Sequence, residues 1–189
     1  MALKKEGTLW AWGRNDFGQL GDPSRLIAPE PFRVGNEKGW RSISAGAGTS
    51  FALRQDGTLY GWGKNFSGQI GDGSDTDRLR PAKVATDRHW KAVYAGAAHT
   101  LAIDTQGNLY GWGDNAQKQL PVEAKRQLKP LMLSAETGWL DVLAGPNFTL
   151  AIKPDRTFEA WGPVNRHVVE TLVVSVYALE EAQTQKPGS

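Results

Sequence analysis

The sequence predicts an all-β fold, a partial (half) β-propeller of about three four-stranded antiparallel blades plus a half blade. The dipeptide Trp-Gly recurs at spacings of 50, 50 and 49 residues along the 189-residue chain, and a fixed period of this size indicates a repeat architecture. The chain contains 22 Gly, 10 Pro and 8 Trp. This composition favours many short strands joined by turns.

Three strand-like blocks recur in register in successive units. They are residues 7–15, 57–65 and 107–115, then 40–46, 90–96 and 139–145, and then 49–53, 99–103 and 148–152. The blocks are rich in β-branched or aromatic residues and end at Gly or at a turn such as Gln55-Asp56-Gly57, which predicts strands joined by tight hairpins. A fourth, weaker strand is expected at 31–34, 81–84 and 130–133, where the leading Pro suits an edge strand.

These blocks predict a repeat domain over residues 1–166, followed by two further segments. Its units lie near 7–35, 40–85, 90–133 and 139–166. The first unit begins at the third strand of a blade, so half a blade is expected there. Residues 167–180 are predicted to be a C-terminal strand or arm, and residues 181–189 a polar tail.

All eight Trp residues are interpreted as mainly structural. The Trp of each Trp-Gly pair is expected to fill space between neighbouring blades, with its indole N–H needing one partner. Small residues such as Ala52 and Ala102 would let adjacent sheets approach closely. The residues given this structural role are Trp12, Gly13, Trp62, Gly63, Trp112, Gly113, Trp161, Gly162, Trp40, Trp90, Trp139, Gly46, Gly96 and Gly145.

Residues 12–21, WGRNDFGQLG, resemble the signature of the regulator of chromosome condensation repeat family, and residues 62–71 repeat it. The third copy has Lys118 and Pro121 at two Gly positions, and the fourth keeps only Trp161-Gly162. In its short array of repeats the chain most resembles short bacterial or phage members of the family. The resemblance implies the propeller fold, in this family usually a ring of seven blades, and does not specify an activity.

Members of the family that the chain resembles have three known activities. The residues of this sequence argue against each of them. The Gly-Trp-Arg-His-Thr motif of the plant ultraviolet receptor is missing, since Gly39-Trp40-Arg41 lies one strand too early. Guanine-nucleotide exchange on a small GTPase needs a protruding hairpin, for which the constant repeat spacing leaves no room. Residues 112–122 resemble the Pro-closed repeat of a secreted bacterial β-lactamase inhibitor, but no export signal precedes them.

The sequence predicts no catalytic residue, no cofactor, no metal site and no small-molecule substrate. His89, His99 and His167 share no ligand spacing, and His99 is expected to be a hydrogen-bonded structural residue. The acidic segment 72–77 matches a Ca²⁺ loop poorly and is interpreted as a solvated turn. The chain has no Cys, which excludes disulfides and a thiolate nucleophile.

Charge and hydropathy favour a protein partner over nucleic acid or a membrane. A net charge of +2 is too small to predict nucleic-acid binding by itself. No apolar run is long enough for a membrane span, and Met1 to Gly7 lacks the apolar core of a signal peptide. The expected location is therefore cytoplasmic at synthesis, with the virion as the alternative.

Two sets of residues are candidates for partner binding. Residues 168–179 form the most apolar segment, which either pairs with another strand or supplies the fourth strand of the last blade. Basic loop residues would meet an acidic partner if they share a face, and the alternative is a solvated surface with interspersed acids. The candidates are Val169, Leu172, Val174, Val176, Tyr177, Arg78, Arg80, Lys125 and Arg126.

The predicted function is a non-catalytic structural or protein-interaction subunit. It would complete its open propeller edges by self-association, giving a homo-oligomer, or by insertion into a larger assembly such as a phage tail or baseplate. The alternative is a monomeric protein-binding or inhibitor module that uses its loops. A guanine-nucleotide exchange factor is the third hypothesis.

Overall fold

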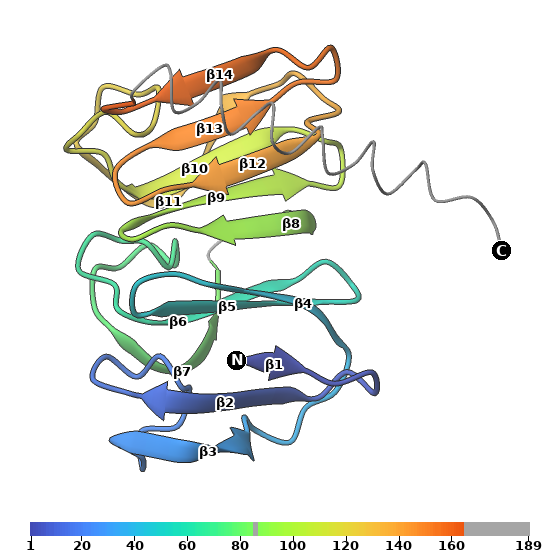
Figure 1. The fold of residues 1–189 in the computed structure, drawn as a ribbon, viewed down its shortest axis with the longest axis vertical. Helices are drawn as coiled ribbons and strands as arrows, with labels where there is room; N and C mark the ends of the chain where they lie inside the picture. Colours follow the sequence, from blue (N-terminus) through green and yellow to red (C-terminus); the bar gives the residue numbers. More distant parts are fainter. Residues whose placement is uncertain (85–86, 165–189) are drawn as a thin grey trace, which may run out of the picture.

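Four antiparallel β-sheets follow one another along the chain and stack along the long axis of the molecule (Figure 1). The computed structural model describes residues 1–84 and 87–164. Over these residues the chain is all β, and none of the described segments forms a helix that is long and apolar enough to cross a membrane. The predicted partial propeller is confirmed.

The two middle sheets each contain four strands. The second sheet consists of β4 (Trp40–Ala45), β5 (Thr49–Arg54), β6 (Leu59–Gly63) and β7 (Arg78–Lys83), in that order. The third consists of β8 (Trp90–Ala95), β9 (His99–Asp104), β10 (Leu109–Asp114) and β11 (Arg126–Ser134). Simple up-and-down order follows because tight Gly-containing turns join β5 to β6 and β9 to β10.

The first and last sheets each contain three strands in the described residues. The first has β1 (Ala2–Leu3), β2 (Leu9–Arg14) and β3 (Ile27–Arg33), and the last has β12 (Asp141–Ala144), β13 (Thr149–Ile152) and β14 (Phe158–Trp161). By register, the first sheet lacks a counterpart of β4 and β8. The described part of the last sheet lacks a counterpart of β7 and β11.

Two details of the predicted blades need correction. The expected N-terminal half blade has one strand more, because Ala2 pairs with Trp10 and Leu3 with Leu9. The Pro-containing strands begin earlier than expected, so that Pro31, Pro81 and Pro130 lie inside β3, β7 and β11. These strands are sheet edges, where a missing N–H breaks no ladder hydrogen bond. The predicted arm at 167–180 and the tail at 181–189 lie outside the described residues.

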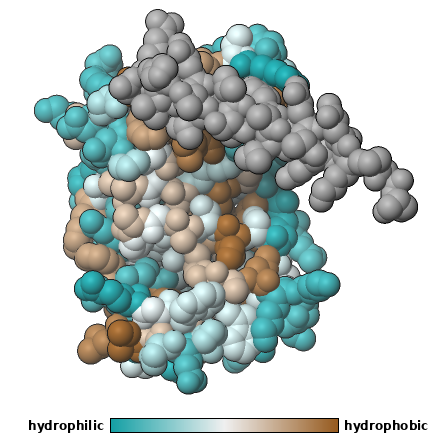
Figure 2. All heavy atoms as spheres, viewed as in Figure 1, coloured by the Kyte–Doolittle hydropathy of each residue, from teal (hydrophilic) through white to brown (hydrophobic). Residues whose placement is uncertain are grey.

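The hydrophobic cores lie between sheets. Leu9 and Ala11 of the first sheet pack against Ala52 and Trp62 of the second, and equivalent clusters join the second sheet to the third and the third to the last. Consequently β9 is buried along its whole length. On the face seen in Figure 2, apolar residues lie mostly along the middle of the stack, with hydrophilic residues toward its sides.

Candidate interaction site

One buried Asn organises the long loop after the Trp-Gly strand in each of the first three sheets. The Oδ1 atoms of Asn15, Asn65 and Asn115 accept the N–H of the residue five positions later, at 2.8, 2.9 and 2.8 Å. Their Nδ2 groups donate to loop carbonyls, as from Asn65 to Ser74 and Thr76 at 3.1 and 3.0 Å. The hydrogen bonds of each Asn side chain thus hold together a loop that lies outside the strands.

The Gln of the same motif connects the first sheet to the second and the second sheet to the third. The carbonyl oxygen of Gln19 accepts hydrogen bonds from Trp62 Nε1 at 2.9 Å and Ser50 Oγ at 2.7 Å. The carbonyl of Gln69 accepts the same pair from the third sheet, Trp112 Nε1 and Thr100 Oγ1, both at 2.8 Å. The indole partner that the sequence required is therefore a backbone carbonyl of the preceding sheet.

Glycines of the motif permit the close approach. A Cβ on Gly71 would lie 2.6 Å from Trp112 Nε1. A Cβ on Gly18 would lie 2.7 Å from Leu79 Cα, on the outer strand of the next sheet. Lys118 occupies the equivalent position in the third sheet, where it adopts a positive φ of 59°. The third loop therefore presents a side chain where the first two accept a neighbouring strand.

The first Trp of the repeat differs from the others. Trp62 and Trp112 are 0% exposed, whereas Trp12 is 43% exposed. Its neighbour Ala11 faces the second sheet and is buried, so Trp12 points to the opposite face, against which no sheet packs within residues 1–84 and 87–164. The expectation that the Trp of each Trp-Gly pair fills space between neighbouring blades is therefore wrong for Trp12.

The remaining repeat residues have structural positions. Trp40, Trp90 and Trp139 are buried, and Trp161 packs against the cluster between the third and last sheets. Gly13, Gly63, Gly113 and Gly162 all have positive φ. Gly46 and Gly96 follow strands β4 and β8, and the Cβ positions of both point at a neighbouring Gly carbonyl, of Gly96 and Gly145 respectively.

The candidate basic residues do not form one free surface. Arg78 pairs with Asp72 and also donates to Ser74, inside its own loop. Arg126 bridges two sheets, contacting Asp75 at 3.3 Å and donating to the carbonyl of Phe66 at 3.0 Å. Arg80 lies on a pocket described below, and Lys125 is exposed. The C-terminal candidates lie outside the part of the chain that the structure describes.

Asp72 corrects the interpretation of segment 72–77 as a solvated turn. Its side chain is only 6% exposed. Burial opposes its ionisation, but hydrogen bonds from Ser74 and the guanidinium of Arg78 outweigh this effect and lower the pKa of Asp72 below its usual value. Across the described ranges no three His, Asp or Glu side chains are grouped as metal ligands.

His99 has the hydrogen-bonded structural position that the sequence predicts. It is fully buried, and its Nε2 lies 3.0 Å from Thr149 Oγ1, across the interface between the third and last sheets. Burial lowers the pKa of His99 to about 4, while Asp114 opposes this shift. The imidazole is therefore neutral at physiological pH.

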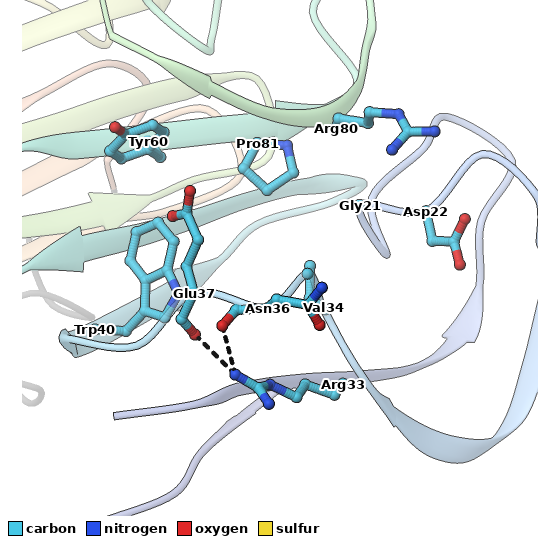
Figure 3. Close-up of a pocket in the computed structure, with 11 residues that line it drawn as sticks. Gly21, Asp22, Arg33, Val34, Asn36, Glu37, Trp40, Tyr60, Arg80 and Pro81 are labelled. Atoms are coloured by element: carbon cyan, nitrogen blue, oxygen red, sulfur yellow. Dashed lines mark hydrogen bonds between the residues drawn. The ribbon is translucent and has the colours of Figure 1, made fainter. Parts of the chain in front are cut away.

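A pocket opens between the first and second sheets (Figure 3). Its volume is about 400 Å³, and its walls come from the end of β3, the segment leading into β4, and the strands β6 and β7. Trp40 and Tyr60 form one wall, with their rings 5.3 Å apart and nearly perpendicular. Sequence reasoning missed this pocket because its walls come from segments that are far apart in the chain.

Family models match the repeats over most of the first three sheets. Two models, each described as the regulator of chromosome condensation repeat, match residues 6–53 and 56–103, and residues 40–69 and 90–119. The chain belongs to the regulator of chromosome condensation repeat family. A search of curated proteins found no match.

Solved structures of family members share the fold. Human WBSCR16 is 22% identical with a TM-score of 0.74, over 84% of this chain and 43% of that protein. Yeast RCC1 (Prp20) bound to Kap60 is 25% identical with a TM-score of 0.72, over 85% and 40%. Prp20p of Saccharomyces cerevisiae, described with its binding to Gsp1p and histones, is 22% identical with a TM-score of 0.69, over 94% and 44%. This chain therefore spans less than half the length of these proteins.

Proposed function

We propose that this protein is a non-catalytic protein-interaction subunit whose first sheet docks against a β-sheet of a second polypeptide. One observation carries the proposal: Trp12 is exposed although its two equivalents are buried and hydrogen-bonded to a preceding sheet. The open face presents the indole whose equivalents form an inter-sheet contact twice within the molecule. A second copy of this chain, or a subunit of a larger assembly, supplies the missing sheet.

Neighbouring residues support this use of the face. Trp10 lies on the same side of β2, with its indole N–H donated to Thr8 Oγ1 at 3.1 Å and the Lys4 ammonium 3.8 Å from its ring centre. Large aromatic side chains are enriched at the centres of protein interfaces. Family membership supports the same class, because two of the neighbours are described with protein partners.

The test is the mass of the pure protein by light scattering, compared with Trp12→Ala. Association through the open face predicts a mass above the monomer that falls to the monomer in the variant, with an unchanged circular dichroism spectrum. Phe66→Ala is the matched control, because Phe66 is an exposed aromatic residue on a loop of the second sheet. A compact monomer for the unmodified chain would contradict self-association and leave the loop-based binding module as the better proposal.

Guanine-nucleotide exchange has weaker support. Yeast RCC1 is among the structural neighbours, but the connections within the second and third sheets are compact and each is organised around one Asn, as described above. Insertion into a phage tail or baseplate stays a prediction from the sequence alone.

A further inference from the structure

The pocket between the first two sheets has the volume of a ligand site. Small-molecule and side-chain pockets in proteins commonly enclose ~300–1,000 Å³, and this one encloses about 400 Å³. Its charged lining residues are Asp22, Arg33, Glu37 and Arg80. Figure 3 shows Glu37 beside Trp40, Arg33 below them, and Arg80 and Asp22 on the other side of Pro81.

Both acids of the lining already have partners. Asp22 accepts hydrogen bonds from the backbone and side chain of Ser24 and pairs with Arg25 at 3.1 Å. Glu37 pairs with Arg54, which also lies over the ring of Trp40, 5.0 Å from its centre. Their negative charges are therefore largely neutralised within the protein.

Neither of the two guanidinium groups in the lining forms an ion pair with a carboxylate of the described residues. Arg33 donates its Nη2 to the backbone carbonyls of Asn36 and Glu37, at 2.7 and 3.4 Å. Its buried Nε–H has no acceptor among the described residues. The side chain of Arg80, which also lines the pocket, makes no ion pair or hydrogen bond within the same residues. The pocket thus carries two positive groups in excess of what its own acids compensate.

The buried indole N–H of a lining residue also lacks a partner. Trp40 is 4% exposed, and its Nε1 has no partner in residues 1–84 and 87–164. Trp90, its equivalent in the third sheet, also lacks an Nε1 partner. An unpartnered indole N–H is therefore common to both repeats and does not by itself distinguish the first interface. The combination with a pocket and two arginines is specific to the first interface, because register places Lys83 and Lys129 at the positions of Arg33 and Arg80.

We propose that this pocket receives the carboxylate of an Asp or Glu side chain from an acidic segment of a protein partner. Guanidinium groups bind carboxylates with strong, often bidentate hydrogen bonds. The rings of Trp40 and Tyr60 cover the apolar stem of the incoming side chain. This inference deepens the proposed protein-interaction function by naming what a partner inserts.

The test uses two blocked tetrapeptides, acetyl-Gly-Glu-Glu-Gly-amide and its Gln-Gln counterpart, titrated against the full chain. The ¹H–¹⁵N indole resonance of Trp40 should shift with the Glu peptide and not with the Gln peptide. Arg80→Met should lower the affinity for the Glu peptide about tenfold, as the loss of a charge-assisted hydrogen bond predicts. Because the side chain of Arg80 has no partner among the described residues, this variant should keep its fold, as the remaining indole resonances will report.

Lys129→Met is the matched control, because it removes a positive charge at the equivalent position of the third sheet and should leave peptide affinity unchanged. Equal binding of the Gln peptide, or an equal loss in both variants, would overturn the proposal. A Trp40 shift at lower concentrations of inorganic phosphate than of peptide would instead assign the pocket to phosphate. Arg80→Met should keep the mass measured by light scattering, so failure of this inference is distinguishable from failure of the docking face.

Discussion

At the scale of single residues, His99 links the folding of this protein to pH. Its imidazole lies between the third and last sheets against Thr149, and burial lowers its pKa to about 4 from an ordinary 6.5. The unfolded chain therefore binds a proton at a higher pH than the folded chain. Stability from the neutral imidazole is complete above about pH 6.5 and is lost as the pH falls toward 4.

We expect the free energy of unfolding to fall by about 3 kcal/mol between pH 7 and pH 4 on account of His99. Urea titrations of the unmodified protein and of His99→Gln at each pH measure this loss, which should be largely absent in the variant. Carboxylates with lowered pKa values, such as Asp72 and Asp104, begin to lose their contribution from about pH 5 downward. They are present in both proteins, so the difference between the two pH profiles isolates His99. Parallel pH profiles for the two proteins would refute the assignment.

The buried Asn of each loop is a second residue with a measurable contribution. Asn65→Ala would orphan the N–H of Ile70 and the carbonyls of Ser74 and Thr76. Each unsatisfied buried group costs about 1–3 kcal/mol, so the unfolding free energy should drop by about 3 kcal/mol or more. Asn36→Ala, at an exposed position, should change stability by less than about 0.5 kcal/mol. A similar small loss at Asn65 would show that water replaces the side chain.

At the scale of elements, the sequence predicts what each repeat shows locally. The Trp-Gly period and the Gly-bounded blocks were enough to place β5, β6, β9 and β10. The two residues of β1 carry no pattern of their own, and only pairing with Trp10 and Leu9 makes them a strand. Edge strands begin before their Pro because the outer ladder resumes beyond an irregularity in register.

The sequence predicts the interaction site less well than it predicts the strands. Gln19, Gln69 and Gln119 recur in every intact copy, a signal that could have marked the carbonyl contact between sheets. No local pattern could show that Trp12 is open, because its exposure depends on what packs beside the first sheet. The pocket is lined by Arg33 of β3 and Arg80 of β7, which belong to different sheets, so only the folded chain reveals it.

At the scale of the whole molecule, stability is a sum over sheets and the interfaces between them. Gly71→Ala should disrupt the interface between the second and third sheets, because the Cβ of the new residue would collide with the indole of Trp112. We expect a loss of more than about 3 kcal/mol, made up of the cost of a positive φ and of the lost packing. Hydrogen exchange should then show β9 and β10 opening separately from β5 and β6.

Gly35→Ala separates the two contributions. Gly35 also has a positive φ, of 61°, but a Cβ there meets no atom within 4 Å. It should cost about 1 kcal/mol from the backbone alone and leave the hydrogen-exchange pattern cooperative. Equal losses in the two variants would show that the contact with Trp112 adds nothing.

The contact between Gln19 and Trp62 gives the stack a direction. The first and second sheets each offer a carbonyl to the next sheet, and the second and third sheets each donate an indole N–H to the preceding one. Two first sheets brought face to face by a twofold axis would juxtapose donors without an acceptor. If copies of this chain associate through Trp12, their contact would therefore be heterologous, head to tail, and would give a closed ring or an open filament and not a symmetric dimer.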